Sequence, residues 1–200
     1  MKKKSCLVIV AHPDDETIWM GGTILKNSNW DWTILSLCRR DDPDRMPKFM
    51  KVCKYYGVKG LINNLDDEKM NPLSINEVKE KILEILDKLN YDYVYTHGEN
   101  GEYGHIRHKE VHKTVKNLVE NNELKCSKLF YFSYVPGNIM APHDSELRIP
   151  IPNSKADLVL DLKELHKEKI KIITEFYGFA DNIFETLSCN EKEAFMVIEK

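Results

Sequence analysis

The feature that most constrains the fold is a regular alternation of short, β-rich apolar runs with longer segments of helical period. The apolar runs predict strands at residues 6–11, 32–38, 60–65, 91–97, 128–134 and 158–160. Helices are expected between them, most clearly at 76–89, 105–120 and 162–176. This alternation is typical of stacked βα units. We therefore expect an α/β fold, a Rossmann-like three-layer sandwich around a mainly parallel central sheet.

The 200 residues are enough for one well-buried domain and rather few for two. No internal repeat and no linker-like stretch divides the chain, so a single domain over residues 1–200 is expected. Residues 135–152 carry four of the eight prolines, together with Gly137 and Asn138. Prolines in this number resist regular structure, and the segment is predicted to be a long surface loop.

The charge balance makes several classes of partner improbable. With 29 basic and 32 acidic side chains, the chain has no excess of positive charge that would attract nucleic acid or anionic lipid.

No apolar run approaches the roughly 18 residues that a membrane-spanning helix needs. The five cysteines form no Cys-x-x-Cys pair, which argues against both a disulfide framework and a thiolate zinc site. A cytoplasmic protein is expected, and a homo-oligomer remains open.

A cluster of charged side chains directly follows the first apolar strand. His12, Pro13, Asp14, Asp15 and Glu16 separate this strand from a segment that reads as a helix. In a parallel sheet, the cluster then lies at the carboxyl end of a strand, where open α/β folds bind ligands. One aspartate could simply cap the helix. Capping does not explain a histidine with three successive acids, whose mutual repulsion would be costly without a cation.

Imidazole and carboxylate groups are the ligands that zinc accepts when no thiolate is present. His12 and one of the two aspartates can supply two of the three protein ligands of a catalytic zinc site. The other aspartate can then take a proton from the attacking water. The same nitrogen and oxygen ligands serve other divalent metals.

A second cluster, His105, His108 and His112, opens the helix that follows the predicted strand 91–97. The spacings of three and four residues place all three imidazoles on one helical face, so any two could approach one metal ion. Two competing motifs fail here. The acid that a metalloprotease His-Glu-x-x-His motif requires after its first histidine is missing, and the first strand-to-helix turn lacks Gly-x-Gly-x-x-Gly.

Together, Ala-His-Pro-Asp-Asp-Glu at residues 11–16 and Gly-His-Ile-Arg-His at 104–108 resemble the LmbE/PIG-L family of zinc-dependent N-deacetylases. A looser similarity extends from Cys6 to about Phe176. The resemblance implies that His12, Asp15 and His108 bind Zn²⁺ and that Asp14 is the general base. It also implies that His105 stabilises the oxyanion or protonates the leaving amine, and the first of these roles is natural for a protonated imidazole.

The resemblance also implies a substrate-contacting arginine upstream of Gly57-Val58. Counting back favours Arg45, with Arg39 and Arg40 as alternatives. The chain departs from the family pattern at Ile106-Arg107, where many members carry Pro-Asp.

The departure removes a carboxylate from the neighbourhood of the histidines, and Glu99, Glu102 or another acid is expected to orient His105 instead. Arg107 is either a solvated surface residue or a contact for an anionic group of the substrate.

Three further side chains have two interpretations each. His97 is either a substrate contact or a buried, hydrogen-bonded side chain. Trp19 is expected to pack on the sheet rather than to stack on a sugar. His143, in the proline-rich segment, is a candidate for the mouth of the site.

We therefore expect a zinc-dependent hydrolase that removes the N-acetyl group from an N-acetylglucosamine-type amino sugar or its conjugate, with that small molecule as its partner. An amidase for a sugar-thiol conjugate would use the same residues. A protein of another class, which binds a sugar or nucleotide without catalysis, would hold zinc only structurally. Structural zinc sites are usually closed by four ligands, often cysteines, which argues against that third alternative.

Overall fold

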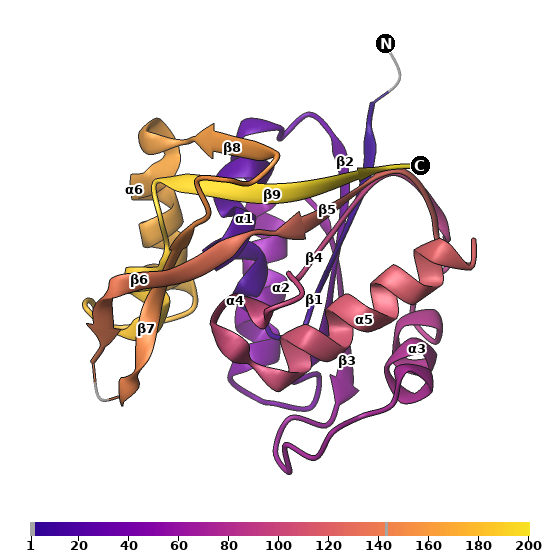
Figure 1. Cartoon of the computed structure of the whole chain (residues 1–200), viewed down its shortest axis with the longest axis horizontal. Coiled ribbons are helices and arrows are strands. Elements are labelled where there is room, and N and C mark those ends of the chain that lie inside the picture. Colours follow the sequence, from indigo (N-terminus) through magenta and orange to yellow (C-terminus); the bar gives the residue numbers. More distant parts are fainter. Residues whose placement is uncertain (1–2, 143) are drawn as a thin grey trace.

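A seven-stranded sheet with the strand order β3-β2-β1-β4-β5-β9-β8 forms the centre of the computed structural model, which describes residues 3–142 and 144–200 (Figure 1). The parallel strands are β1 (Ser5–Val10), β2 (Asp31–Cys38), β3 (Lys59–Leu65), β4 (Asn90–Thr96) and β5 (Lys125–Phe132). At one side, β9 (Lys192–Glu199) pairs antiparallel with β5 and with β8 (Leu158–Asp161). The expected α/β fold with a mainly parallel sheet is confirmed.

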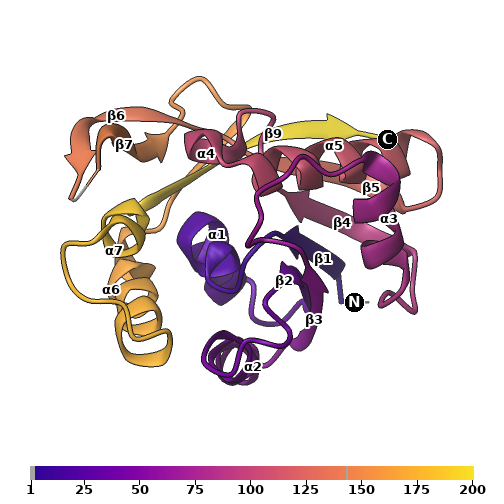
Figure 2. The ribbon, with the colours of Figure 1, turned by 90° about the horizontal axis from the view of Figure 1, so that it is seen from below.

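Helices cover both faces of the parallel strands and give the three layers. Figure 2 shows α1 (Asp15–Lys26) and α2 (Arg45–Tyr56) on one face, and α3 (Ile75–Leu83) and α5 (Ile106–Glu120) on the other. Each face has its own core cluster, because alternate side chains of a strand point to opposite sides. Val8 and Val10 pack under α1 and α2, whereas Leu7 and Ile9 pack under α3 and α5. Strands buried on both faces explain the continuous apolar runs in the sequence.

The remaining helices are short and belong mostly to the C-terminal part. They are α4 (Gly101–Gly104), α6 (Lys163–Lys171), a π-helical turn at Ile172–Phe176 and α7 (Phe184–Ser188). The helix predicted at 162–176 is thus an α-helix that runs into a π-turn. The helix predicted at 76–89 ends earlier, at Leu83, where its hydrogen bonding tightens to Ile85 N–Ile82 O. No helix formed by residues 3–142 or 144–200 is long and apolar enough to cross a membrane.

The prediction of a surface loop at residues 135–152 is wrong. The segment forms a two-stranded hairpin of β6 (Tyr134–Ala141) and β7 (Asp144–Pro152), in which Pro136 is paired with Pro150. Both strands of a two-stranded sheet are edge strands, and proline is tolerated on an edge because its missing N–H faces no partner. Strand β9 and helix α7, to which the sequence analysis assigned no structure, complete the C-terminal part.

Helix α1, which carries Asp15, is fixed by a buried ion pair. The backbone of α1 departs from helical geometry at Met20 (φ −149°), just before the N–H groups of Gly22 and Thr23. Both donate to the fully buried carboxylate of Glu193, at 2.8 and 2.9 Å. Lys169 donates to the same carboxylate at 2.9 Å, and the pairing offsets the cost of burying both charges.

Candidate metal centre

The histidine and aspartate side chains of the two sequence motifs meet at the topological switch point of the sheet. Strand β1 lies between β2 and β4. The strands that follow β1 in sequence, β2 and β3, lie on one side of it, and β4 and β5 lie on the other side. The carboxyl ends of β1 and β4 therefore open into a crevice, where α/β folds bind ligands. His12 follows β1, while His105 and His108 enter the crevice from the start of α5.

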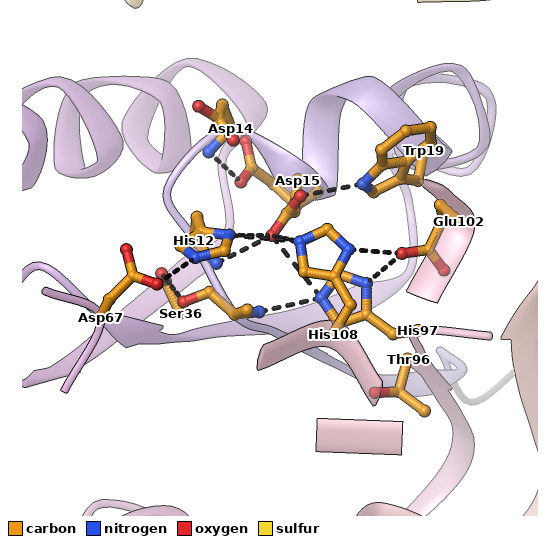
Figure 3. A network of polar contacts seen from close by, with 12 residues as sticks. His12, Asp14, Asp15, Trp19, Ser36, Asp67, Thr96, His97, Glu102 and His108 are labelled. Carbon is orange, nitrogen blue, oxygen red and sulfur yellow. Dashed lines mark hydrogen bonds and ion pairs between the residues drawn. The ribbon is translucent and has the colours of Figure 1, made fainter. Parts of the chain in front are cut away.

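Three donor atoms form a nearly regular triangle in this crevice (Figure 3). His12 Nδ1 lies 3.2 Å from Asp15 Oδ2 and 3.2 Å from His108 Nε2, and His108 Nε2 lies 3.4 Å from Asp15 Oδ2. Ligand atoms of a tetrahedral zinc ion are about 3.3 Å apart, because the bonds to nitrogen and oxygen are about 2.0–2.1 Å long. The triangle thus matches one face of a tetrahedral site and leaves the fourth position for water or substrate.

Each of these three side chains is held by a further hydrogen bond on its far side. Asp67 accepts from His12 Nε2 at 3.0 Å, and Glu102 accepts from His108 Nδ1 at 2.6 Å. The indole of Trp19 donates to Asp15 Oδ1 at 2.9 Å. A carboxylate on one ring nitrogen fixes the imidazole tautomer that presents the other nitrogen to a metal. The donor set and its outer partners therefore fit a divalent cation.

The electrostatics of the donor set also favour a cation. Burial alone would lower the pKa of His12, but hydrogen bonds to Asp15 and Asp67 raise the pKa to about 9. For His108, the effect of burial is likewise outweighed by Asp15 and Glu102, which raise the pKa to about 10. The negative potential that holds protons on these rings also attracts a metal ion, whose binding would release the protons.

Asp14 lies beside the triangle in a strained conformation. Its φ is 114°, which a non-glycine residue rarely adopts, and its N–H donates to the buried carboxylate of Glu16 at 3.1 Å. Asp14 Oδ2 accepts from Arg45 Nη1 at 3.0 Å. Burial and the neighbouring charge of Asp15 raise the pKa of Asp14 well above its usual range. A carboxylate with a raised pKa accepts protons more readily, as a general base must.

Asp15 has the opposite electrostatic environment. Burial alone would raise the pKa of this carboxyl, but the charges of His108 and His97 and hydrogen bonds to His108 and His12 hold the pKa well below the usual range. Asp15 therefore stays ionised. The two adjacent aspartates, which the residues alone could not distinguish, are thus separated by their surroundings into an ionised carboxylate and a proton acceptor.

His105 caps the start of α5 with its ring 4.7 Å from that of His12 and 4.8 Å from that of His108. Its Nδ1 is buried and has no hydrogen-bond partner among the described residues. Burial, together with the charges of His108 and His12, lowers the pKa of His105 to about 3. The expectation of a protonated His105 therefore fails for the resting site, where the imidazole is neutral.

A cavity of about 280 Å³ opens beside these residues. Its lining residues are His12, Pro13, Asp14, Asp15, Ile18, Trp19, Arg39, Asp42, Arg45, Tyr103, His105, Phe184 and Glu185. Arg45 and Arg39 both face the cavity, whereas Arg40 contacts the exposed Asp41 and does not line it. The guanidinium of Arg45 also packs over the ring of Phe179 at 4.6 Å.

Two other combinations of donor atoms in the described residues fit a metal less well. His97 lies near Asp15 and His108. Its Nε2, however, accepts a hydrogen bond from the Ala11 N–H at 2.9 Å, so its lone pair is already used. Cys38 lies near His12 and Asp67. Burial raises the pKa of the Cys38 thiol well above its usual value, which disfavours the thiolate that would bind a metal.

His97 and His112 are buried and hydrogen-bonded rather than substrate contacts. His97 Nδ1 lies 2.8 Å from Glu102 Oε2, and His112 Nδ1 lies 2.9 Å from the His97 carbonyl. Trp19 is buried in the core, as expected, and in addition binds Asp15 and lines the cavity. His143 lies outside the described residues.

Two expectations for the α4–α5 region are wrong. Glu102 contacts His108 and His97, not His105. Arg107 is neither on the surface nor at the substrate cavity, because its side chain is fully buried against Asp66 and Glu110.

Asp67 was not among the site residues expected from the sequence. It lies two residues after the end of β3, at the same edge of the sheet as His12, so its position near a strand end was a usable signal.

Residues 7–119 match the protein family described as PIG-L, GlcNAc-PI de-N-acetylase. The matched region is more than half of the chain. It contains the three donor residues His12, Asp15 and His108, and it also contains Asp14, His105 and Arg45. The chain belongs to the PIG-L family. Membership of this family supports a hydrolytic deacetylase that acts on a sugar. The three donor residues support a divalent metal at this site.

Individual proteins similar to this PIG-L chain include one from Acanthamoeba polyphaga mimivirus, 24% identical over 201 residues, covering 90% of this chain and 78% of the viral protein. The structure of N,N'-diacetylchitobiose deacetylase from Pyrococcus horikoshii is similar with a TM-score of 0.67 and 19% identity, covering 98% and 84% of the two chains. GalB, the 4-carboxy-2-hydroxymuconate hydratase from Pseudomonas putida, is similar with a TM-score of 0.58 and 14% identity, covering 98% and 97%. At such identities, these structures show a shared fold and not a shared reaction.

Proposed function

We propose that this protein is a zinc-dependent N-deacetylase that removes the acetyl group from an N-acetylglucosamine-type amino sugar or a conjugate of it. The observation that carries the proposal is the triangle of His12, Asp15 and His108 donor atoms, two of whose residues, His12 and Asp15, line one cavity together with Asp14. Three protein ligands without a thiolate are typical of catalytic zinc sites.

When bound there, zinc supplies Lewis-acid chemistry that makes water acidic enough to act as a nucleophile near neutral pH. Asp14 accepts the proton that this water loses as its oxygen bonds to the amide carbon. The contact between Asp14 and Arg45 keeps the carboxylate in place and limits how far burial raises its pKa.

His105 acts on the carbonyl side of the amide. As a neutral imidazole, it donates an N–H hydrogen bond to the oxygen on which negative charge develops, which stabilises the transition state. The carbon–nitrogen bond then breaks, the amine nitrogen takes the proton held by Asp14, and acetate and the free amino sugar leave. One water is consumed and no redox partner is needed.

The cavity favours a small polar substrate. Its volume of about 280 Å³ suits an acetamido group and one sugar ring. Arg45, Arg39, Asp42 and Glu185 offer charged partners for hydroxyl groups, and the rings of Trp19, Tyr103 and Phe184 offer apolar surface. Alternation of polar groups and aromatic rings is the pattern that binds a sugar, whose faces are apolar and whose edges carry hydroxyls.

A mass-spectrometric screen for acetyl loss tests this proposal. Free, nucleotide-linked and lipid-linked N-acetylglucosamine and an acetylated sugar-thiol conjugate are incubated with the protein as purified, after chelation, and after zinc is restored. We expect deacetylation of at least one amino sugar, loss of activity on chelation, and recovery with zinc. Asp14→Asn should lower kcat by roughly 10²–10⁴-fold while zinc content stays unchanged, since general bases contribute about that much.

Asp41→Asn is the matched control, because Asp41 is an exposed carboxylate that binds Arg40 outside the cavity. This variant should retain wild-type activity. Turnover of the sugar-thiol conjugate alone would favour the amidase alternative. Retained zinc with no acetate from any substrate, and no effect of Asp14→Asn, would favour a non-catalytic binding protein.

A further inference from the structure

Arg107 is adjacent in sequence to His108, yet it is not among the residues that line the cavity. Its side chain is fully buried, and its guanidinium is occupied by the segment between β3 and α3. Nε donates to the Asp66 carbonyl at 2.5 Å, Nη2 to the Asp66 carboxylate at 3.2 Å, and Nη1 to the Asn71 carbonyl at 2.9 Å. Arg107 therefore ties α5 to two points of this segment.

Glu110, one turn further along α5, completes the attachment. One carboxylate oxygen accepts from Arg107 Nη1 at 2.6 Å, and the other accepts from the Leu73 N–H at 2.7 Å. Residues 66–73 contain no helix or strand, and residues 68–72 are exposed. A segment with so few contacts of its own depends on such anchors for a fixed position.

The anchored segment carries Asp67, which orients one of the three metal-donor side chains. Asp67 Oδ1 accepts from His12 Nε2 at 3.0 Å, and Asp67 Oδ2 accepts from Arg39 Nη2 at 2.6 Å. A proton held on Nε2 by this carboxylate leaves the Nδ1 lone pair of His12 directed at Asp15 and His108. The position of Asp67 thus determines which nitrogen His12 presents.

We infer that Arg107 is a positioning residue of the metal centre: it holds residues 66–73 against α5, so that Asp67 keeps His12 in its metal-binding tautomer and orientation. The inference rests on the metal centre of the proposed function. It assigns to Arg107 an effect on metal affinity rather than on substrate binding. The neighbouring residues thus have complementary tasks, since His108 is itself a donor and Arg107 acts on His12 through Asp67.

The test measures zinc affinity of the metal-free protein by competition with a colorimetric chelator. Arg107→Met keeps much of the side-chain volume but none of the hydrogen bonds, and it should weaken zinc binding by roughly 10- to 100-fold, the range typical of outer-sphere partners. Asp67→Asn should weaken binding by a similar factor. The double variant should bind zinc no more weakly than Asp67→Asn alone, because both changes act through the same contact.

Val115→Ala is the matched control for a loss of stability. Val115 lies on the same helix, is fully buried in the core and makes none of the hydrogen bonds that attach residues 66–73 to α5, so its truncation lowers the melting temperature and leaves these hydrogen bonds in place. Its zinc affinity should equal that of the wild type. Glu110→Gln changes the same attachment more mildly and serves as the test if Arg107→Met does not fold. It should lower zinc affinity by a smaller factor than Arg107→Met.

Three outcomes would overturn the inference. The first is unchanged zinc affinity in a folded Arg107→Met or, failing that, in Glu110→Gln. The second is additive losses in the double variant, which would mean that Arg107 does not act through Asp67. Both leave the proposed function standing. A wild-type protein that binds no zinc would overturn the metal centre and this inference together.

Discussion

The cavity has two walls of different construction. On the metal side, the side chains of His12 and Asp15 are 17 and 4% exposed, and that of His108, which does not itself line the cavity, is 0% exposed; each is held by a second hydrogen-bonded partner. On the opposite side, the side chains of Arg45 and Arg39 are 31 and 36% exposed. The metal donors come from the residues that follow β1 and from the first turns of α1 and α5. The opposite side is built from the segment that joins β2 to α2, from the start of α2 and from the short helix α7.

This difference separates the reaction from the choice of substrate. Buried side chains that follow β1 or lie in the first turns of α1 and α5 cannot move without disturbing the core, as a metal site requires. Residues on connecting segments and short helices can change with little cost to the core. The family match at residues 7–119 contains the whole metal side, whereas Phe184 and Glu185 lie beyond it. We therefore expect substitutions on the metal side to affect metal and rate, and those opposite to affect mainly substrate affinity.

The largest effect is expected for His108→Ala. Loss of one of three donors should weaken zinc binding by more than the roughly 100-fold typical of an outer-sphere change, and activity should fall to background. Metal analysis and acetate release measure both. His112→Ala, one turn along the same helix, removes an imidazole that contacts the His97 carbonyl and the Tyr131 ring and is not one of the three donors. Equal zinc loss in the two variants would mean that helix integrity, not coordination, is being measured.

Glu102→Gln comes next. The carboxylate accepts hydrogen bonds from His97, His108 and the Gly98 N–H, and an amide places an N–H against one of these donors. Zinc affinity, measured by chelator competition, should fall by roughly 10- to 100-fold. A variant with unchanged affinity would show that His108 needs no outer partner, and the contrast between the two walls would weaken.

The same substitution should change the pH dependence of stability. Burial alone would raise the pKa of Glu102, but His97 and His108 lower it from 4.5 to about 2. A carboxyl whose pKa is lower in the folded state than in the unfolded state stabilises the fold at pH values above its unfolded-state pKa. This contribution is lost as the pH falls toward the folded-state pKa. The stability difference between metal-free wild type and Glu102→Gln should therefore narrow between about pH 5 and pH 2, as followed by urea unfolding.

A smaller effect, on substrate affinity and pH profile, is expected for Arg45→Met. KM should rise by roughly 10-fold or more, since hydrogen bonds to a charged group contribute about 1.5–3 kcal/mol. Arg45 lowers the pKa of Asp14, so its removal raises that pKa further. The acid limb of the kcat/KM profile should then move to higher pH. Arg40→Met, an arginine outside the cavity, should change neither quantity.

The smallest effect is expected for Phe184→Ala. Its ring packs edge-on against Tyr103 at 4.7 Å and contributes apolar surface to the cavity. KM should rise by roughly 2- to 10-fold with kcat nearly unchanged, in line with the 0.5–1.5 kcal/mol of an aromatic contact. Phe176→Ala, whose ring contacts Tyr55 away from the cavity, is the control. A large loss of kcat in Phe184→Ala would contradict the division between the walls.

The sequence by itself determined the parallel strands and the two motifs at their ends. Buried parallel strands appear as apolar runs, and the residues that follow such a strand lie at the ligand-binding edge of the sheet. His12 and Asp15 are three residues apart, and His105 and His108 are also three apart, so local geometry keeps each pair together. Local patterns of this kind are readable because they need no knowledge of distant contacts.

Only the tertiary structure decided which partners orient these side chains. Asp67 is 55 residues from His12, and Arg107 is 41 residues from Asp66. Contacts between residues so far apart in sequence depend on the tertiary fold, which the periodicity of the sequence does not encode. The same holds for the proline-rich hairpin and for α7, whose places are set by packing against the sheet. Neighbouring charges and hydrogen bonds, which are also tertiary properties, separated Asp14 from Asp15, because two adjacent buried carboxyls of identical chemistry differ only in what surrounds them.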